Sequence, residues 1–155
     1  MKLLRYGPRG GEKPGLLDAA GRIRGLSRVV GEGDPEMLSP DGLARLAAID
    51  PETLPLVPEG TRIGPCVGRV GKFVAIGLNY SEHAAEAGMA IPTEPVVFMK
   101  ATSCISGPND DVIAPRGFSK LDWEVELGVV IGTEARYVTK EAALDHVAGY
   151  CVVND

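Results

Sequence analysis

Two glutamates stand two residues apart in the segment LDWEVELGVVIG, residues 121–132. Alternate residues of a strand project to the same side, so Glu124 and Glu126 would share one face, about 7 Å apart along the chain. Two ionised carboxylates at that separation repel each other, and a divalent cation with hard oxygen ligands, such as Mg²⁺, removes the repulsion. The pair is therefore either a metal-binding pair or part of a solvated strand face, since alternating polar residues are also typical of exposed strands.

A histidine and a glutamate form a second candidate in the segment SEHAAEAG, residues 81–88. His83 and Glu86 are three residues apart, and such residues are neighbours on one face of a helix. A carboxylate beside an imidazole fixes its tautomer and raises its basicity, as a general base requires. The alternative is an exposed helical pair with no chemical role.

Further polar residues stand at the ends of predicted elements. Lys100 ends the strand-like run VVFMK, where it would hold a substrate carboxylate or simply be solvated. Asp155 follows the apolar run CVV and is a possible third acidic ligand. His146 lies near the C-terminal end of a predicted helix. An imidazole at that position can simply interact with the helix dipole, so we assign it no chemistry. Asp110 belongs to the predicted turn SGPNDD.

The elements that must position these residues are short, because the chain has 20 glycines and 12 prolines in 155 residues. In the best-marked helix, Ser39 is the predicted N-cap, Pro40 the first helical residue and Asp41 a favourable partner of the dipole. Ser81 and Gly88 would bound the second helix, and Thr139 would begin a third. Helices are predicted over 38–50, 81–88 and 139–149. Strands are predicted over 1–7, 73–80, 95–102 and 122–132 and from 150 onwards, with two further short strands within 15–30. The strand over 73–80 is expected to be buried.

The segment 51–72 is rich in proline and glycine and is the predicted domain boundary. We expect an α+β, mostly β chain. Its small β-rich N-terminal domain with one helix would occupy residues 1–70, and the first part of a mixed β-sheet roll would occupy residues 71–155. A strand-like run that stops at Asp155 is unusual for a terminus, so we expect a fragment, a processed chain or a subunit.

Composition excludes several classes of function. The formal net charge is −5, which argues against a nucleic acid partner because phosphate binding needs a basic surface. The N-terminus has no apolar signal-peptide core and no run reaches membrane-spanning length, so we expect a cytoplasmic protein without membrane contact. Cys66, Cys104 and Cys151 form no CxxC motif and are expected to be reduced packing residues.

Four motifs in order, FVAIGLNYSEHAAEAG, EPVVFMKATSCISGPND, DWEVELGVVIG and AGYCVVND, resemble the fumarylacetoacetate hydrolase family. The resemblance covers nearly the whole chain and is strongest from Phe73 to Asp155. The chain looks most like the bacterial subgroup of ureidoglycolate lyases and 2,4-diketo-3-deoxy-fuconate hydrolases. The fold implied for the second part is that of the family's C-terminal domain, whose members continue well past this aspartate.

The resemblance implies a role for each candidate residue. Glu124, Glu126 and Asp155 would bind Mg²⁺ or Mn²⁺, the pair His83 and Glu86 would be catalytic, and Lys100 would support substrate binding. The implied reaction is hydrolytic cleavage of a C–C bond in a 2,4-diketo acid by a homodimer, with the metal as Lewis acid and the His–Glu pair activating water. The alternatives are a ureidoglycolate lyase that releases urea and glyoxylate, and an inactive fragment or subunit.

Overall fold

The structure is a computed structural model that describes residues 1–31 and 35–155. It is mostly β with few helices, as predicted. The chain packs as two compact units, one made of residues 1–68 with 106–155 and the other of residues 69–105. The predicted division into domains at residue 70 stays a prediction. None of the described helices is long and apolar enough to cross a membrane.

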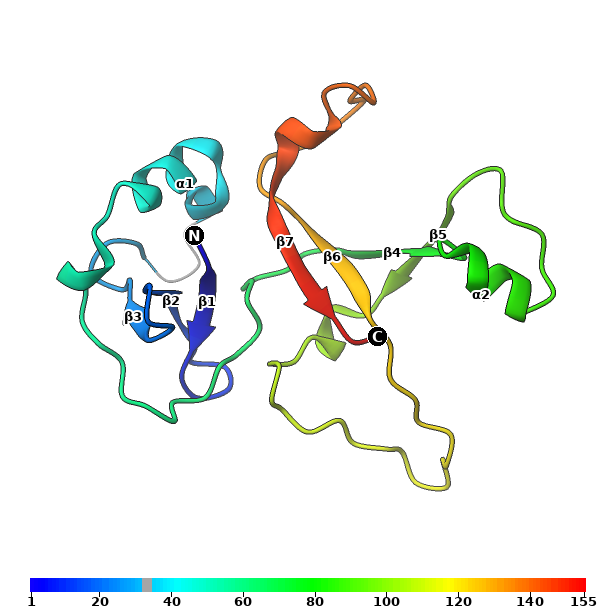
Figure 1. Ribbon diagram of the computed structural model, residues 1–155, viewed down its shortest axis with the longest axis horizontal. Helices are drawn as coiled ribbons and strands as arrows, with labels where there is room; N and C mark the ends of the chain where they lie inside the picture. Colours follow the sequence, from blue (N-terminus) through cyan, green and yellow to red (C-terminus); the bar gives the residue numbers. More distant parts are fainter. Residues whose placement is uncertain (32–34) are drawn as a thin grey trace. The chain divides into compact units, whose positions relative to one another are not determined.

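The N-terminal part of the first unit is an antiparallel three-stranded sheet in the order β1–β2–β3 (Figure 1). Its strands are β1 (Leu3–Tyr6), β2 (Lys13–Leu17) and β3 (Ile23–Gly25). The two strands predicted within 15–30 are β2 and β3, and the turn between them contains Gly21, whose φ of +77° favours glycine. A small apolar core packs beside the sheet and consists of Leu16, Leu26, Leu46 and Leu54.

Helix α1 (Pro40–Ala47) begins where the sequence predicts. The Ser39 hydroxyl accepts a hydrogen bond from the Gly42 N–H at 3.1 Å, and Pro40 occupies the first turn. Leu46 is only 2% exposed and joins the core, whereas Ala47 is exposed. Short 3-10 turns over Pro35–Leu38 and Pro51–Thr53 flank the helix.

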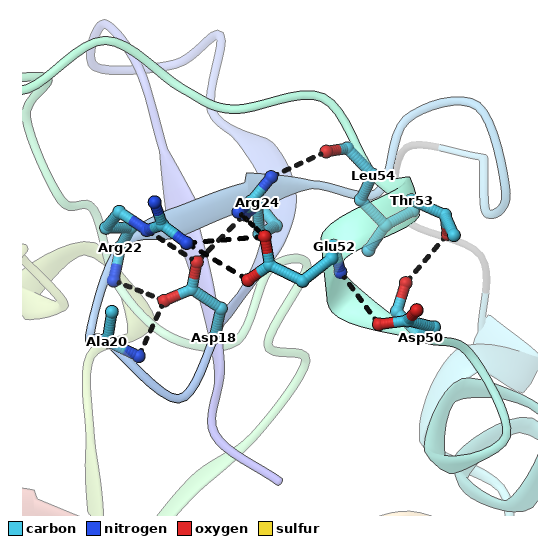
Figure 2. Close-up of polar contacts among 8 residues, drawn as sticks. All are labelled: Asp18, Ala20, Arg22, Arg24, Asp50, Glu52, Thr53 and Leu54. Carbon is cyan, nitrogen blue, oxygen red and sulfur yellow. Dashed lines mark hydrogen bonds and ion pairs between the residues drawn. The ribbon is translucent and has the colours of Figure 1, made fainter.

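A charged cluster ties β3 to the turn over Pro51–Thr53 (Figure 2). The Asp18 carboxylate accepts hydrogen bonds from the backbone N–H of Ala20 and of Arg22, at 3.0 and 2.9 Å. It also accepts from the Nε atoms of Arg22 and Arg24, at 2.8 and 2.9 Å. Arg24 is buried and donates from Nη2 to Glu52 at 2.6 Å, so its charge is paired on both sides.

Burial by itself would raise the pKa of Asp18, because it disfavours the charged form. The hydrogen bonds from the Arg22 N–H and from the guanidinium groups of Arg24 and Arg22 outweigh that effect. Together they lower the pKa of Asp18 to about 2. The carboxylate is therefore ionised at neutral pH and holds the β2–β3 turn closed.

A second charged cluster ties the turn after residue 106 to the N-terminal sheet. Arg62 donates to both carboxylate oxygens of Asp110, from Nε at 2.7 Å and from Nη2 at 2.6 Å, and from Nη1 to Glu12 at 2.9 Å. The predicted turn is confirmed, since Asp110 also accepts from the Gly107 N–H at 2.8 Å. The Arg62 guanidinium is the main cause that holds the pKa of Asp110 well below its usual range.

The unit of residues 69–105 is an antiparallel ribbon of β4 (Phe73–Gly77) and β5 (Val96–Lys100), with helix α2 (Ser81–Glu86) in the connection. The prediction that the first of these strands is buried is wrong, because a two-stranded ribbon leaves one face uncovered in this unit: Val74 is 50% exposed.

The ends of α2 follow the sequence only in part. The predicted C-terminal glycine is confirmed, since Gly88 follows the last turn with a φ of +64°. The predicted N-cap at Ser81 is wrong. Tyr80 takes the extended N-cap position, so Ser81 is already helical and its hydroxyl contacts Glu82 at 3.2 Å.

The last ribbon pairs β6 (Glu126–Ile131) with β7 (Val147–Val153) in antiparallel register (Figure 1). The predicted helix over 139–149 is wrong. Only Ala143–His146 form a 3-10 turn, and the chain becomes extended at Val147. The β-branched and aromatic residues of VAGYCVV pair with β6, and this pairing overrides the helical preference of the alanines before them. The ribbon exposes an apolar face made of Leu127, Val129, Ile131, Tyr150 and Val152.

Candidate active site

The three predicted acidic ligands lie at or beyond one end of the β6–β7 ribbon. Glu126, the first residue of β6, lies opposite Val153, the last residue of β7. The predicted strand over 122–132 begins only at Glu126, so Glu124 precedes the paired strands and Asp155 follows them. The Glu124 N–H donates to the Asn154 Oδ1 at 2.7 Å, so the two chain segments remain in contact beyond the ribbon. The two segments that carry the three carboxylates thus lie side by side at this end of the ribbon.

The chemistry of these side chains suits a divalent cation, since three carboxylates offer the hard oxygens that Mg²⁺ and Mn²⁺ prefer. Glu124 and Asp155 are exposed and Glu126 is half-buried. Among the described residues, no three His, Cys, Asp or Glu side chains are gathered closely enough to hold a metal ion. The donor types suit the cation, while the assignment of these residues as ligands stays a prediction.

The predicted catalytic pair lies on α2. Because His83 and Glu86 are both helical and three residues apart, they occupy neighbouring positions on one face of the helix. Both side chains are exposed, whereas Ala84 is fully buried and packs the opposite side of the helix. The helix thus presents an imidazole and a carboxylate together, in the unit of residues 69–105. Their catalytic role stays a prediction.

Lys100 ends β5, where it pairs with Phe73. Its ammonium group lies 5.5 Å from the centre of the Phe98 ring, on the same side of the strand, in a cation–π contact. An aromatic ring under the ammonium group restricts the positions that the side chain can take. Lys100 is thus a partly ordered positive charge at a strand end, as a carboxylate-binding group would be.

His146 is the last residue of a 3-10 turn, so the helix C-terminus that we expected around it is absent. Its Nδ1 lies 3.1 Å from the Thr133 hydroxyl, at the opposite end of the ribbon from Glu126. The absence of a chemical role for His146 stays a prediction.

Two features were missed by the sequence analysis. It assigned no role to Asn154, whose side chain joins the segment before β6 to the segment after β7. The expectation that all three cysteines are packing residues is also wrong, because Cys66 and Cys104 are exposed. The run VVND contains a polar pair after an apolar strand, which could have indicated Asn154. The spacing of the cysteines in the sequence does not indicate which of them are exposed.

Comparison with known proteins decides the family. Residues 72–155, more than half of the chain, match the family described as "Fumarylacetoacetate (FAA) hydrolase C-terminal". The chain belongs to the fumarylacetoacetate hydrolase family. The matched residues include all six of the predicted site residues. Neither the match nor the relatives described below identify the bacterial subgroup that the motifs resemble.

Solved structures of the family share this fold. The fumarylacetoacetate hydrolase of Exiguobacterium antarcticum matches the whole chain with a TM-score of 0.78 at 29% identity, over 55% of its own length. A Mycobacterium abscessus protein provisionally named as a 2-hydroxyhepta-2,4-diene-1,7-dioate isomerase matches with a TM-score of 0.74 at 31% identity, over 52% of its length. These likenesses confirm the predicted fold class.

A closer relative in sequence is a Burkholderia cenocepacia protein whose provisional name is that of a hydrolase. It is 67% identical to this chain over all 155 residues, which correspond to 55% of the relative. The chain thus spans about half the length of the curated relatives that it matches.

Proposed function

We propose that this chain carries part of the active site of a divalent-metal-dependent hydrolase that cleaves a C–C bond in a 2,4-diketo acid. The substrate would be an acylpyruvate or a diketo-deoxy sugar acid. The observation that carries the proposal is the β6–β7 pairing together with the Glu124–Asn154 hydrogen bond, which bring the segments carrying Glu124, Glu126 and Asp155 to one end of the ribbon. Those three residues lie within the part of the chain that matches the family.

Glu124, Glu126 and Asp155 would hold Mg²⁺ or Mn²⁺. When bound, the cation would supply Lewis-acid polarisation of the 2-oxo acid end of the substrate. The three carboxylates would thus act as ligands, and their mutual repulsion would be relieved by the charge that they bind.

His83 would act as general base and take a proton from the attacking water, while Glu86 would orient the imidazole and stabilise its charge. The water oxygen would bond to the distal carbonyl carbon. The C–C bond next to that carbonyl would then break, and its electron pair would pass to the neighbouring carbon, which takes up a proton. The products would be a carboxylic acid and a 2-oxo acid. Lys100 would bind the substrate carboxylate by charge.

The finer predictions form part of the same proposal. The subgroup of ureidoglycolate lyases and diketo-deoxy-fuconate hydrolases, the cytoplasmic location and the homodimer stay predictions. The family includes proteins named as hydrolases and one provisionally named as an isomerase, so membership alone leaves the substrate open. We rank ureidoglycolate cleavage second and a catalytically inactive fragment or subunit third.

The test compares wild type with Glu124→Gln in the intact protein that contains this chain. Acylpyruvate turnover would be followed by pyruvate release with and without Mg²⁺, and ureidoglycolate turnover by release of urea and glyoxylate. We expect Mg²⁺-dependent pyruvate release in the wild type and its near-complete loss in Glu124→Gln. Full Mg²⁺-dependent turnover by Glu124→Gln would make the ligand assignment wrong.

Two controls separate the alternatives. Glu134→Gln removes an exposed carboxylate from the loop after β6, and we expect it to leave turnover unchanged. Release of glyoxylate in place of pyruvate would favour the lyase. If the 155-residue chain is folded but inactive while the intact protein turns over substrate, the chain is a fragment of the enzyme.

A further inference from the structure

The unit of residues 69–105 is joined to the rest of the chain by two connections. The chain leaves the first unit after residue 68 and returns to it at residue 106. The proposed catalytic pair and the proposed carboxylate-binding lysine all lie between these two points. The exit segment (residues 62–64) and the return segment (residues 106–110) therefore stand close to the two ends of this unit in the chain.

The exit segment is fixed to the edge of the N-terminal sheet. Ile63 forms an antiparallel bridge with Tyr6, the last residue of β1. Next to this bridge, the Gly64 N–H donates to the Arg5 carbonyl at 2.8 Å. The exit segment is thus a short addition to the β1 edge, and backbone pairing holds it there.

The return segment is attached to the exit segment by a forked ion pair. Arg62 donates to one carboxylate oxygen of Asp110 from Nε at 2.7 Å and to the other from Nη2 at 2.6 Å. Such a bidentate pair fixes the relative orientation of its two groups as well as their distance. The Asp110 side chain is only 9% exposed, and it also accepts from the Gly107 N–H at 2.8 Å. The ion pair therefore holds the turn of the return segment against the exit segment.

The backbones of the two segments also touch. Gly107 is buried, and a Cβ atom added to it would overlap the Ile63 carbonyl oxygen and lie 3.1 Å from the Gly64 Cα. Glycine is the residue that allows a backbone to approach so closely. The contact lies three residues from Asp110, so the forked ion pair and the glycine contact hold the same two segments together.

We propose that Arg62, Asp110 and Gly107 form a clamp that restrains the unit of residues 69–105 at its two connections, and that Arg62 and Asp110 are thereby positioning residues for the proposed catalytic pair. Two connections that are tied together leave a unit less freedom to move than two separate linkers would. The clamp acts through the backbone of these connections. The positioning role rests on the proposed function, whereas the restraint does not.

Hydrogen exchange of the intact protein, followed by mass spectrometry, tests the restraint. Asp110→Asn and Arg62→Lys each keep the approximate size of the side chain and lose the forked ion pair. We expect peptides from residues 69–105 to exchange several-fold faster in both variants, because local opening of this unit becomes more frequent. Peptides from β1 and β2 should change little. Gly107→Ala alters no charge and should give the same pattern, because the added methyl group pushes the two segments apart.

Two control variants separate the clamp from a general loss of stability. Arg24→Lys weakens the other charged cluster of the first unit, away from both connections. Asp111→Asn removes the exposed carboxylate next to the clamp. Both should leave exchange over residues 69–105 at the wild-type level. Wild-type exchange there in Asp110→Asn and Gly107→Ala would overturn the proposal, and so would an increase that is equally large in β1 and β2.

Kinetics of the intact protein test the positioning role. Asp110→Asn should lower kcat roughly ten- to hundredfold, as a small misplacement of catalytic groups does. Its affinity for Mg²⁺ should be unchanged, because none of the three proposed ligands belongs to the unit that the clamp releases. Faster exchange with a normal kcat would overturn the positioning role. A wild type that turns over neither substrate would contradict the proposed function instead, and the exchange data would decide on the clamp by themselves.

Discussion

The Glu124 backbone N–H donates a hydrogen bond to the Asn154 side chain at 2.7 Å. This bond joins the residues that precede β6 to those that follow β7, where the backbone ladder itself has ended. Glu124 and Asp155 are thus kept on adjacent chain segments by an amide side chain. Asn154 is a positioning residue for the two carboxylates beside it.

Removal of that side chain should loosen the end of the ribbon. In Asn154→Ala we expect the Glu124 amide to exchange its hydrogen several-fold faster, because a single hydrogen bond contributes about 0.5–1.5 kcal/mol. Hydrogen exchange measured by NMR checks this, with Asn109→Ala in the exposed turn as the control. Unchanged exchange at Glu124 would show that the bond does not hold the segment.

The proposed general base gives a prediction about rate. In the intact protein, His83→Ala should lower kcat by roughly 10²–10⁴-fold, the usual contribution of general acid–base catalysis. Glu86→Gln should cause a smaller loss and shift the pH profile of kcat, because the imidazole would lose its charged neighbour. Glu82→Gln, on the same helix, is the control and should be without effect. A His83→Ala variant with normal kcat would remove this residue from the mechanism.

Metal binding gives a prediction that does not depend on turnover. Mg²⁺ titration by calorimetry should show binding to the wild type and a loss of at least about tenfold in affinity for Glu126→Gln, because a neutral amide is a weaker ligand than a carboxylate. Treatment with a chelator should abolish wild-type activity, and added Mg²⁺ should restore it. Equal affinities of the two proteins would contradict the role of Glu126.

The charged cluster around Asp18 predicts how stability depends on pH. Its pKa is about 2 in the folded chain and 3.8 without these partners, so the folded state is favoured while this group is ionised. That contribution is fully present above about pH 4 and is lost as the pH falls toward 2. The lowered pKa values of Glu12 and Asp110 act in the same direction.

Urea unfolding measured between pH 6 and pH 2 checks this prediction. We expect the unfolding midpoint of the wild type to fall steeply over the acidic part of the range. Asp18→Asn should begin from a lower midpoint at pH 6 and lose less on acidification. Asp111→Asn is an exposed control, and its curve should run parallel to that of the wild type. Parallel curves for Asp18→Asn would assign the acid sensitivity to other carboxylates.

The small N-terminal core predicts a large cost for one truncation. Leu46→Ala should lower the free energy of unfolding by about 2–5 kcal/mol, because Leu46 is buried among the other core leucines. Leu43→Ala, at a half-buried position on the same helix, should cost clearly less. Chemical denaturation of the two variants measures the difference. Equal losses would mean that the core does not determine the stability of this unit.

Local signals allowed several elements to be predicted from the sequence. Ser39 and Pro40 mark the start of α1, and Gly21 and Gly88 mark a turn and a helix end. These features depend on sterics and hydrogen bonds within a few residues, so the sequence alone is sufficient for them. The prediction failed over 139–149, where EAALDH favours a helix but pairing with β6 extends the chain from Val147.

The candidate site likewise has features that the sequence predicts and features that depend on the tertiary structure. The alternation of Glu124 and Glu126, and the three-residue spacing of His83 and Glu86, can be read from the sequence because strand and helix periods are local properties. The closeness of the segments that carry Glu124 and Asp155 depends on the β6–β7 pairing and on the Asn154 side chain, which no local pattern determines. The spacing of Glu124 and Glu126 was thus settled by the sequence, and the meeting of their segment with the end of β7 by the tertiary structure.

The contacts of Arg62 with Asp110, and of Arg24 with Glu52, join segments that are distant in the sequence. No local rule selects such partners, because each side chain could have paired with several others of the same type. Packing of the chain into a compact unit brings one of those partners within reach and excludes the others. The sequence by itself therefore determined which groups could act, and the tertiary structure decided which of them meet.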